Sequence, residues 1–199
     1  MTGKKTARPK ILAFSGSART SSFNQTLVEN AARAAESAGA EVRLINLRDF
    51  PMPIMNQDLE REQGQPEHGT RLKELMIEHD GFLIASPEHN SSIPALLKNA
   101  FDWASRRVGD EAPLIAYKGK TTALLSASPG RLGGLRGLVH VRAILGNLGA
   151  FVLPEQHAVS SANKAFDDDG RLVNDFDIDK VNGIAERLVT TTAALMQTD

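Results

Sequence analysis

Apolar and polar residues recur along the chain with two different periods. Compact apolar runs of a few residues predict buried strands, whereas apolar residues repeating every three or four positions predict helices. The expected strands cover residues 10–15, 41–46, 81–86 and 121–127, with a short one around 151–153. The expected helices cover residues 24–38, 66–79, 94–104, 137–148 and 177–196.

Strands that alternate with helices indicate βαβ units, a parallel sheet and right-handed crossovers. Five strands favour a flavodoxin-like α/β three-layer sandwich with strand order 2-1-3-4-5 over a six-stranded dinucleotide fold. A chain of 199 residues suits one domain, which we place at residues 10–199 after a flexible tail at residues 1–9. The basic leader lacks the apolar stretch of a secretory signal, so a cytoplasmic location is expected.

A polar loop at residues 16–24 follows the first predicted strand and opens onto a helix N-terminus. It offers hydroxyls, one amide and one cation, on Ser17, Ser22, Asn24 and Arg19. Backbone N–H groups at a helix start favour an anion, and hydroxyls with a guanidinium can surround a phosphate. The chain has neither a Walker A loop nor GxGxxG here, which favours a terminal monophosphate over a pyrophosphate. The alternative is that a serine only caps the helix.

A second polar loop, residues 86–94, follows the third predicted strand. In an open α/β sheet, ligands bind at the carboxyl ends of strands. Prolines stiffen this loop, and its backbone amides from Glu88 to Ser92 suit a planar, polar ring edge. Glu88 is a candidate general base and His89 a candidate proton donor, with a structural carboxylate and a surface histidine as the alternatives. The whole loop can equally be a rigid crossover whose polar groups satisfy their own backbone.

Three further segments have open interpretations. Glycines at residues 130, 133 and 134 permit a close approach to a ligand or form a simple turn. Residues 47–56 either wall a pocket for a flat apolar substrate or anchor a loop in the core. Phe101 and Trp103, at helical spacing, indicate core or subunit contact rather than a stacking platform.

Composition narrows the chemistry. The chain has no cysteine, which removes disulfides, thiolate nucleophiles and thiolate metal sites, so redox chemistry requires a bound organic cofactor or another metal site. The five histidines show no ligand spacing, and no metal site is expected. A net charge of −1 without a basic stripe gives no reason to expect nucleic acid, and no apolar run is long enough for a membrane span.

Two motifs resemble those of the NADPH-dependent FMN reductases, the flavodoxin-like group that includes bacterial quinone, chromate and azo-dye reductases. The first, GSxRxxSxN, is matched within residues 16–24. The second, SPEYNxSxPxxLKNAxDW, is matched within residues 86–103, except that His89 stands where the family usually has tyrosine. The glycine-rich third loop also lies where the family has one. The resemblance covers roughly residues 10–195.

The resemblance implies roles for the loop residues. The FMN phosphate would be held by Ser17, Arg19, Ser22, Phe23 and Asn24. The ring and ribityl side would be lined by Pro87, Glu88, His89, Asn90, Ser91 and Ser92, and the opposite rim by the third loop, including Ser128 and Gly130.

The implied activity is hydride transfer from NADPH or NADH to flavin N5 and then to a quinone, free flavin or similar small acceptor. The flavin carries this chemistry, so no catalytic side chain is required. The resemblance also implies a homodimer or homotetramer. A flavodoxin-type electron carrier for protein partners is the alternative; such carriers tend to be strongly acidic, and this chain is almost neutral.

Overall fold

The computed structural model describes residues 8–197, and these residues form a central parallel sheet. Its strand order is β2-β1-β3-β4-β5, as the sequence predicts, and every neighbouring pair is parallel. The strands are β1 (Lys10–Ser15), β2 (Glu41–Asn46), β3 (Gly81–Ala85), β4 (Thr121–Ala127) and β5 (Phe151–Val159).

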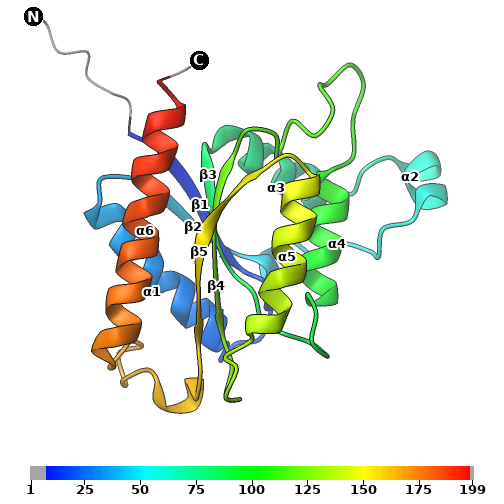
Figure 1. The fold of residues 1–199 in the computed structure, drawn as a ribbon. Helices are drawn as coiled ribbons and strands as arrows, with labels where there is room; N and C mark the ends of the chain where they lie inside the picture. The colour runs from blue at the N-terminus through cyan, green and yellow to red at the C-terminus, as the bar shows by residue number, and fades with distance from the viewer. Residues whose placement is uncertain (1–7, 198–199) are drawn as a thin grey trace, which may run out of the picture.

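Helices cover both faces of the sheet, which gives the predicted three layers (Figure 1). One face carries α1 and α6, and the other carries α3, α4 and α5. The helices are α1 (Phe23–Ser37), α2 (Gln57–Gln63), α3 (Glu67–Glu78), α4 (Ala95–Ala104), α5 (Leu135–Asn147) and α6 (Asp175–Leu195). Of the predicted tail, residues 1–7 lie outside the described residues, and the Pro9 carbonyl accepts a hydrogen bond from Glu41 N at 2.9 Å.

The core is divided by the sheet into two apolar clusters. Alternate residues of a strand face opposite sides, so Leu12 and Phe14 of β1 pack under α3–α5 while Ile11 and Ala13 pack under α1 and α6. Every residue of β3 and β4 is buried, whereas β2 at the sheet edge is largely exposed. The central strands are therefore the rigid part of the scaffold, and the loops that follow them are well supported.

The largest difference from the predicted elements is the length of β5. The sequence predicts a strand around residues 151–153, but β5 continues through Pro154 to Val159. Val152 pairs with Thr122 and Gln156 with Leu124, so three residues of β5 oppose one of β4 and form a bulge. Proline lacks the N–H that a central strand needs for its hydrogen-bond ladder. It is tolerated at this bulge on an edge strand, because no ladder N–H is needed there.

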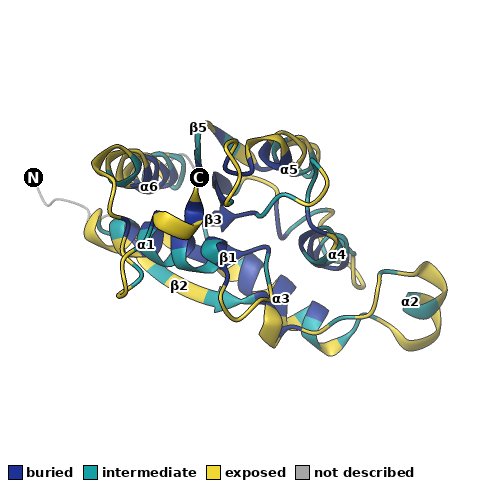
Figure 2. Cartoon of the chain, turned by 90° about the horizontal axis from the view of Figure 1, so that it is seen from below, coloured by how far each residue is buried: buried dark blue, intermediate teal, exposed yellow. Residues whose placement is uncertain are grey.

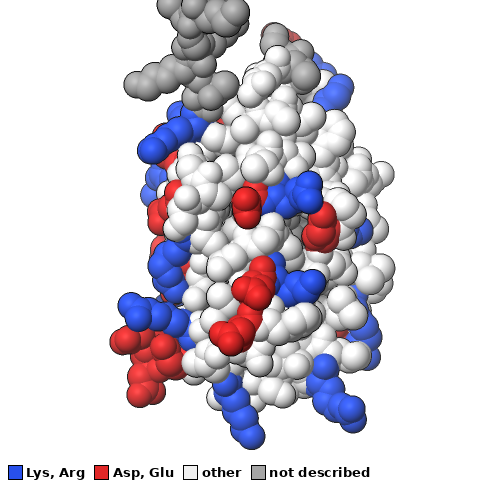
Figure 3. All heavy atoms as spheres, turned by 60° about the vertical axis from the view of Figure 1, so that its left-hand side comes forward, with Lys and Arg blue, Asp and Glu red and all other residues white. Residues whose placement is uncertain are grey.

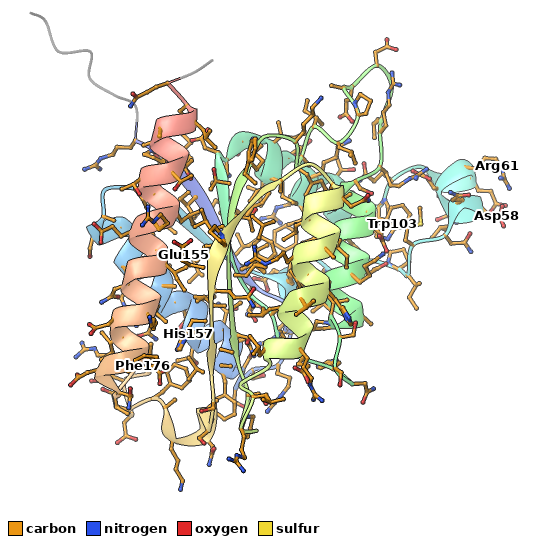
Figure 4. The ribbon with its side chains drawn as sticks, viewed as in Figure 1. Asp58, Arg61, Trp103, Glu155, His157 and Phe176 are labelled. Atoms are coloured by element: carbon orange, nitrogen blue, oxygen red, sulfur yellow. The ribbon has the colours of Figure 1, made fainter. Side chains whose placement is uncertain are left out.

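A second difference is an arm, defined here as residues 51–65, within a segment predicted to be a loop. The arm contains α2, which has no buried residue and stands away from the body of the molecule (Figure 2). Trp103 Nε1 donates to the Pro53 carbonyl at 2.8 Å and holds the base of the arm, while Asp58 and Arg61 lie out on α2 (Figure 4).

Just before the arm, Phe50 is 3% exposed and anchored in the core, whereas Ile54 is 85% exposed. The core-anchor interpretation of residues 47–56 therefore holds for Phe50 and not for Ile54.

The surface carries charges of both signs. On the face that includes α6, lysines and arginines alternate with aspartates and glutamates, and neither sign gathers into a large patch (Figure 3). Among the described residues, no helix is both long enough and apolar enough to cross a membrane.

Candidate functional site

Three loops follow β1, β3 and β4 and meet at the carboxyl edge of the sheet. We call them the first loop (residues 16–24), the second loop (residues 86–94) and the third loop (residues 128–134). The ladder hydrogen bonds continue into them, with Gly16 N donating to Ala85 O at 2.9 Å and Ser86 N to Leu125 O at 2.9 Å. The parallel topology thus brings together the two polar loops that the sequence singles out.

Glycine makes this meeting close. A Cβ added to Gly16 would lie 2.9 Å from Leu97 Cδ2 and 3.3 Å from Pro87 Cδ, so the first loop packs directly on the second loop and α4. In the third loop, Gly133 has a φ of +61°, and a Cβ there would lie 2.7 Å from the Ala158 backbone. A side chain at Gly16 would push the first loop away from the second loop and α4, and one at Gly133 would push the third loop away from β5.

The first loop uses several of its polar groups on itself. Ser22 is the N-cap of α1, and its hydroxyl accepts from Gln25 N at 3.3 Å, as the capping alternative expects. Ser17 Oγ accepts from Arg19 N at 3.3 Å. Phe23 is half-buried and stacks on Phe166 with ring centroids 6.4 Å apart.

Asn24 connects the first loop to the end of β4. Its buried amide donates through Nδ2 to Ala127 O at 2.8 Å and accepts at Oδ1 from Ala127 N at 2.9 Å. Both ends of the amide thus bind one residue of the strand that leads into the third loop. This geometry makes Asn24 a link between two loops.

The first loop still offers groups for an anion. Within residues 8–197, the backbone N–H groups of Ala18, Thr20 and Ser21 have no hydrogen-bond partner. The exposed Arg19 guanidinium has no carboxylate partner in the same part of the chain. Free N–H groups beside an unpaired cation at a helix start have the donor chemistry that a phosphate requires.

Arg48 is a second cation at this loop that sequence reasoning missed. It lies just after β2, and its Nε donates to the Ala18 carbonyl at 2.8 Å. The only sequence signal is that β2 neighbours β1 in the predicted sheet, so their following segments adjoin. Arg48 therefore places a second guanidinium beside the first loop.

In the second loop, the Glu88 carboxylate is bound to the start of α5. Glu88 Oε2 accepts from Arg136 N at 3.0 Å and Gly137 N at 3.3 Å, and Oε1 accepts from Arg136 Nε at 2.9 Å. Burial raises the pKa of Glu88, but the hydrogen bonds from Arg136 and Gly137 outweigh it and leave the pKa below its ordinary value. The fold thus favours the ionised carboxylate of Glu88. This carboxylate stabilises the folded protein at pH values above the ordinary pKa of glutamate, and the stabilisation is lost as the pH falls through the lowered pKa of the folded state. This is the structural-carboxylate interpretation of Glu88, not the general base.

The residues after Glu88 form a tight turn. His89 N donates to Ser92 O and Ser92 N to His89 O, each at 3.0 Å. Asn90 and Ser91, the two central residues, have positive φ angles of 50° and 67°. Their backbone N–H groups have no partner in the described part of the chain, and the His89 side chain is exposed. Exposed N–H groups on a rigid turn suit a polar ring edge.

The third loop contributes less. Ser128 Oγ accepts from Gly130 N at 3.3 Å, and a Cβ on Gly130 would meet only that hydroxyl, at 3.6 Å. The structure places both residues at the common edge, where Ser128 N donates to Val159 O and Ala162 N donates to Ser128 O, each at 3.1 Å. The neighbouring Arg131 is exposed.

Two hollows of the molecule lie away from the three loops. One of about 450 Å³ lies between β5 and α6, and another of about 300 Å³ lies between α1 and α6. No residue of the three loops lines either hollow. The candidate site therefore depends on the open edge formed by the loops themselves.

Comparison with known proteins identifies the family. The family model described as NADPH-dependent FMN reductase matches residues 9–164. An NAD(P)H-dependent FMN reductase of Pseudomonas aeruginosa is 36% identical over 83% of this chain and 85% of that protein. A quinone reductase of Pseudomonas putida is 35% identical over 79% of this chain and 81% of its own length.

A solved structure agrees with these sequences. The flavoenzyme NAD(P)H:(acceptor) oxidoreductase FerB of Paracoccus denitrificans superposes with a TM-score of 0.76 at 27% identity, covering 94% of this chain and 98% of FerB. The chain therefore belongs to the NADPH-dependent FMN reductase family, as its two loop motifs predict, and is a flavin-dependent oxidoreductase.

Proposed function

We propose that this protein is an FMN-dependent NAD(P)H oxidoreductase that reduces quinones, free flavin or similar small acceptors. The observation that carries the proposal is the meeting of the two motif loops at one sheet edge, with unpaired N–H groups and cations. The relatives named as FMN reductase and quinone reductase support this acceptor class.

For the cofactor site, we assign the FMN phosphate to the first loop. Ser17, Ser22 and the start of α1 at Phe23 would supply hydroxyl and N–H donors, and Arg19 the charge. Arg48 adds a second cation beside them. Asn24 supports the loop from behind through Ala127.

The flavin ring is assigned to the second loop and the opposite rim to the third. Pro87 and Glu88 position the turn, while the backbone of His89, Asn90, Ser91 and Ser92 lines the ring edge. Ser128 and Gly130 form the other rim. The protein's task in this arrangement is to bind and orient the cofactor and exclude competing reactions.

The reaction needs no side-chain acid or base. Bound FMN supplies a centre that accepts a hydride from NAD(P)H and passes it on to the acceptor. Overall, NAD(P)H and one solvent proton convert a quinone into a hydroquinone and NAD(P)⁺. The Glu88 carboxylate is not positioned as a base, because it is bound to Arg136 and Gly137.

The test is an anaerobic visible spectrum of the FMN-reconstituted protein before and after NADPH. Rapid bleaching that reverses with benzoquinone is the expected result. Bound flavin that NADPH leaves oxidised would favour a flavodoxin-type electron carrier instead. A protein that retains no flavin would contradict both.

We also propose that the protein is a homodimer or homotetramer in the cytoplasm. This proposal rests on the family resemblance, because singly exposed apolar side chains such as Ile54, Val139 and Phe151 are normal on any protein surface. Light scattering on the eluting protein measures the oligomeric state directly.

A further inference from the structure

The turn at His89–Ser92 has an unfavourable sequence for its shape. A two-residue hairpin turn with positive φ at both central positions favours Asn followed by Gly. Here Asn90 is suitable, but Ser91, at a φ of 67°, carries a Cβ where glycine is preferred. Such backbone persists only where surrounding groups hold it in place.

Helix α5 holds this turn at both ends. On one side, Glu88 accepts four hydrogen bonds, three from Arg136 (through N, Nε and Nη2) and one from Gly137 N, and its side chain is only 9% exposed. On the other side, Ser92 Oγ and His140 Nδ1 are hydrogen-bonded at 2.8 Å. Arg136 and His140 are one helical turn apart, so both ends of the turn are bound to one face of α5.

Between these two ties, the turn rests directly on the helix backbone. A Cβ added to Gly137 would lie 3.1 Å from Ser92 O and 3.4 Å from Glu88 Cα. Glycine at this position lets the turn and α5 approach each other without an intervening side chain. Three independent contacts thus define one turn.

The contacts also decide which groups remain available. The Glu88 carboxylate and the first N–H groups of α5 bind each other, so neither is offered to a ligand. The N–H groups of Asn90 and Ser91 remain unpaired within residues 8–197. The second loop therefore offers two free backbone donors to a flavin, and Glu88 determines where that backbone lies.

We infer that Glu88 is a positioning residue, which holds the strained turn against α5 so that the backbone N–H groups of Asn90 and Ser91 are presented to the flavin ring. That the ligand is a flavin rests on the proposed function. The hydrogen bonds between Glu88 and α5, which we call the clamp, are present in the chain whatever its ligand. The two are tested by separate measurements.

The first measurement is amide hydrogen exchange in the flavin-free protein, over a peptide covering residues 86–93. Glu88→Gln removes the charge and half of the acceptor capacity while keeping the shape. We expect exchange in this peptide to become about tenfold faster or more, because the turn opens locally. His140→Ala, which loosens the other end, should give a smaller increase in the same peptide.

Glu60→Gln is the matched control. Glu60 also accepts twice from an arginine, Arg106 Nε at 2.8 and 3.0 Å, and its side chain is 19% exposed, but it ties the arm and not the turn. Glu60→Gln should lower the midpoint of thermal unfolding by about as much as Glu88→Gln does. It should leave hydrogen exchange in residues 86–93 unchanged. General loss of stability is thereby separated from opening of the turn.

The second measurement is FMN affinity and the reduction potential of the bound flavin. Glu88→Gln should weaken FMN binding about tenfold, as expected for losing a charged hydrogen bond that holds the site, and shift the potential, whereas Glu60→Gln should change neither. Unchanged exchange in residues 86–93 of Glu88→Gln would overturn the clamp. Weaker FMN binding with unchanged exchange would overturn positioning and indicate direct contact. If the wild-type protein binds no FMN, the proposed function fails, and the exchange experiment still decides the clamp.

Discussion

The first and second loops have similar compositions and equivalent positions at the sheet edge, yet they use their side chains differently. In the first loop, the exposed side chain of Arg19 remains unpaired among residues 8–197, and the buried amide of Asn24 ties the loop to β4. In the second loop, the side chains of Glu88 and Ser92 are bound to α5, and within residues 8–197 the backbone N–H groups of Asn90 and Ser91 are left unpaired.

The difference suggests a division of labour. A phosphate is compact and charged, and flexible cations can adjust to it. A planar ring edge requires donors at set positions, which a rigid turn supplies better than mobile side chains. We therefore expect substitution of Arg19 in the first loop to act on the anion, and substitutions behind the second loop to act through geometry.

The largest effect on stability should come from Asn24→Ala. The change leaves the N–H and the carbonyl of Ala127 buried and unsatisfied, at about 1–3 kcal/mol for each group. We expect the free energy of unfolding to fall by about 2–4 kcal/mol in urea denaturation. Thr20→Ala is the control in the same loop, because Thr20 is exposed. A stability loss no greater than that of the control would remove the link between the loop and β4.

Arg19→Ala should act on ligand affinity instead of stability. The loss of one charged hydrogen bond to the phosphate is expected to weaken FMN binding by about 1.5–3 kcal/mol, with the unfolding free energy of the apoprotein unchanged. Titration of FMN fluorescence measures the dissociation constant. Arg33→Ala, an exposed arginine further along α1, is the matched control. Equal affinities for the two variants would exclude Arg19 from the phosphate site.

Substitutions at two glycines of α5 distinguish the effect of packing against the turn from the effect of helix propensity. Gly137 lies against Ser92 O, whereas nothing lies within 4 Å of a Cβ on Gly146. We expect Gly137→Val to destabilise by about 1–3 kcal/mol through overpacking. Gly146→Ala should stabilise by about 0.5–1 kcal/mol, because alanine favours the helix. Thermal unfolding of the two variants compares these signs, and stabilisation by Gly137→Val would mean that the turn does not rest on α5.

Most of the fold follows from local sequence patterns. β1 and β4 have the bounds predicted for them, because compact apolar runs ending at glycine or polar residues mark a buried parallel strand clearly. β2 also has its predicted bounds, which the alternation of apolar residues along residues 41–46 indicates. The extension of β5 through Pro154 depends on its position at the sheet edge and on its bulge. From the sequence alone, a proline is expected to end a strand, because neither the edge position nor the bulge is visible there. Helix α2 depends partly on Glu60 binding Arg106, 46 residues away along the chain.

The candidate site shows the same limit. The meeting of the first and second loops follows from the parallel topology and was predictable. The partners of Asn24 and Glu88 were not, since Ala127 is 103 residues from Asn24 and Arg136 is 48 residues from Glu88. The motif identifies which residues matter, while tertiary contacts decide whether a polar side chain serves the ligand or the loop.

The smallest effect on stability is expected at His89, whose side chain is exposed on the turn that α5 holds. His89→Tyr should change the unfolding free energy by less than about 0.5 kcal/mol, as for other surface substitutions. It should nevertheless change acceptor preference or the pH profile, because histidine is the side chain suited to exchanging a proton near neutral pH, and tyrosine is not. Steady-state rates with two quinones of different size, measured between pH 5.5 and 8.5, test this expectation.

His89→Asn is the control that separates loss of the imidazole from gain of the phenol. A change shared by both variants is due to loss of the histidine, and a change seen only with tyrosine is due to the added ring. Identical profiles for all three proteins would leave the backbone of the turn, held by Glu88, as the part of the second loop that acts on the flavin.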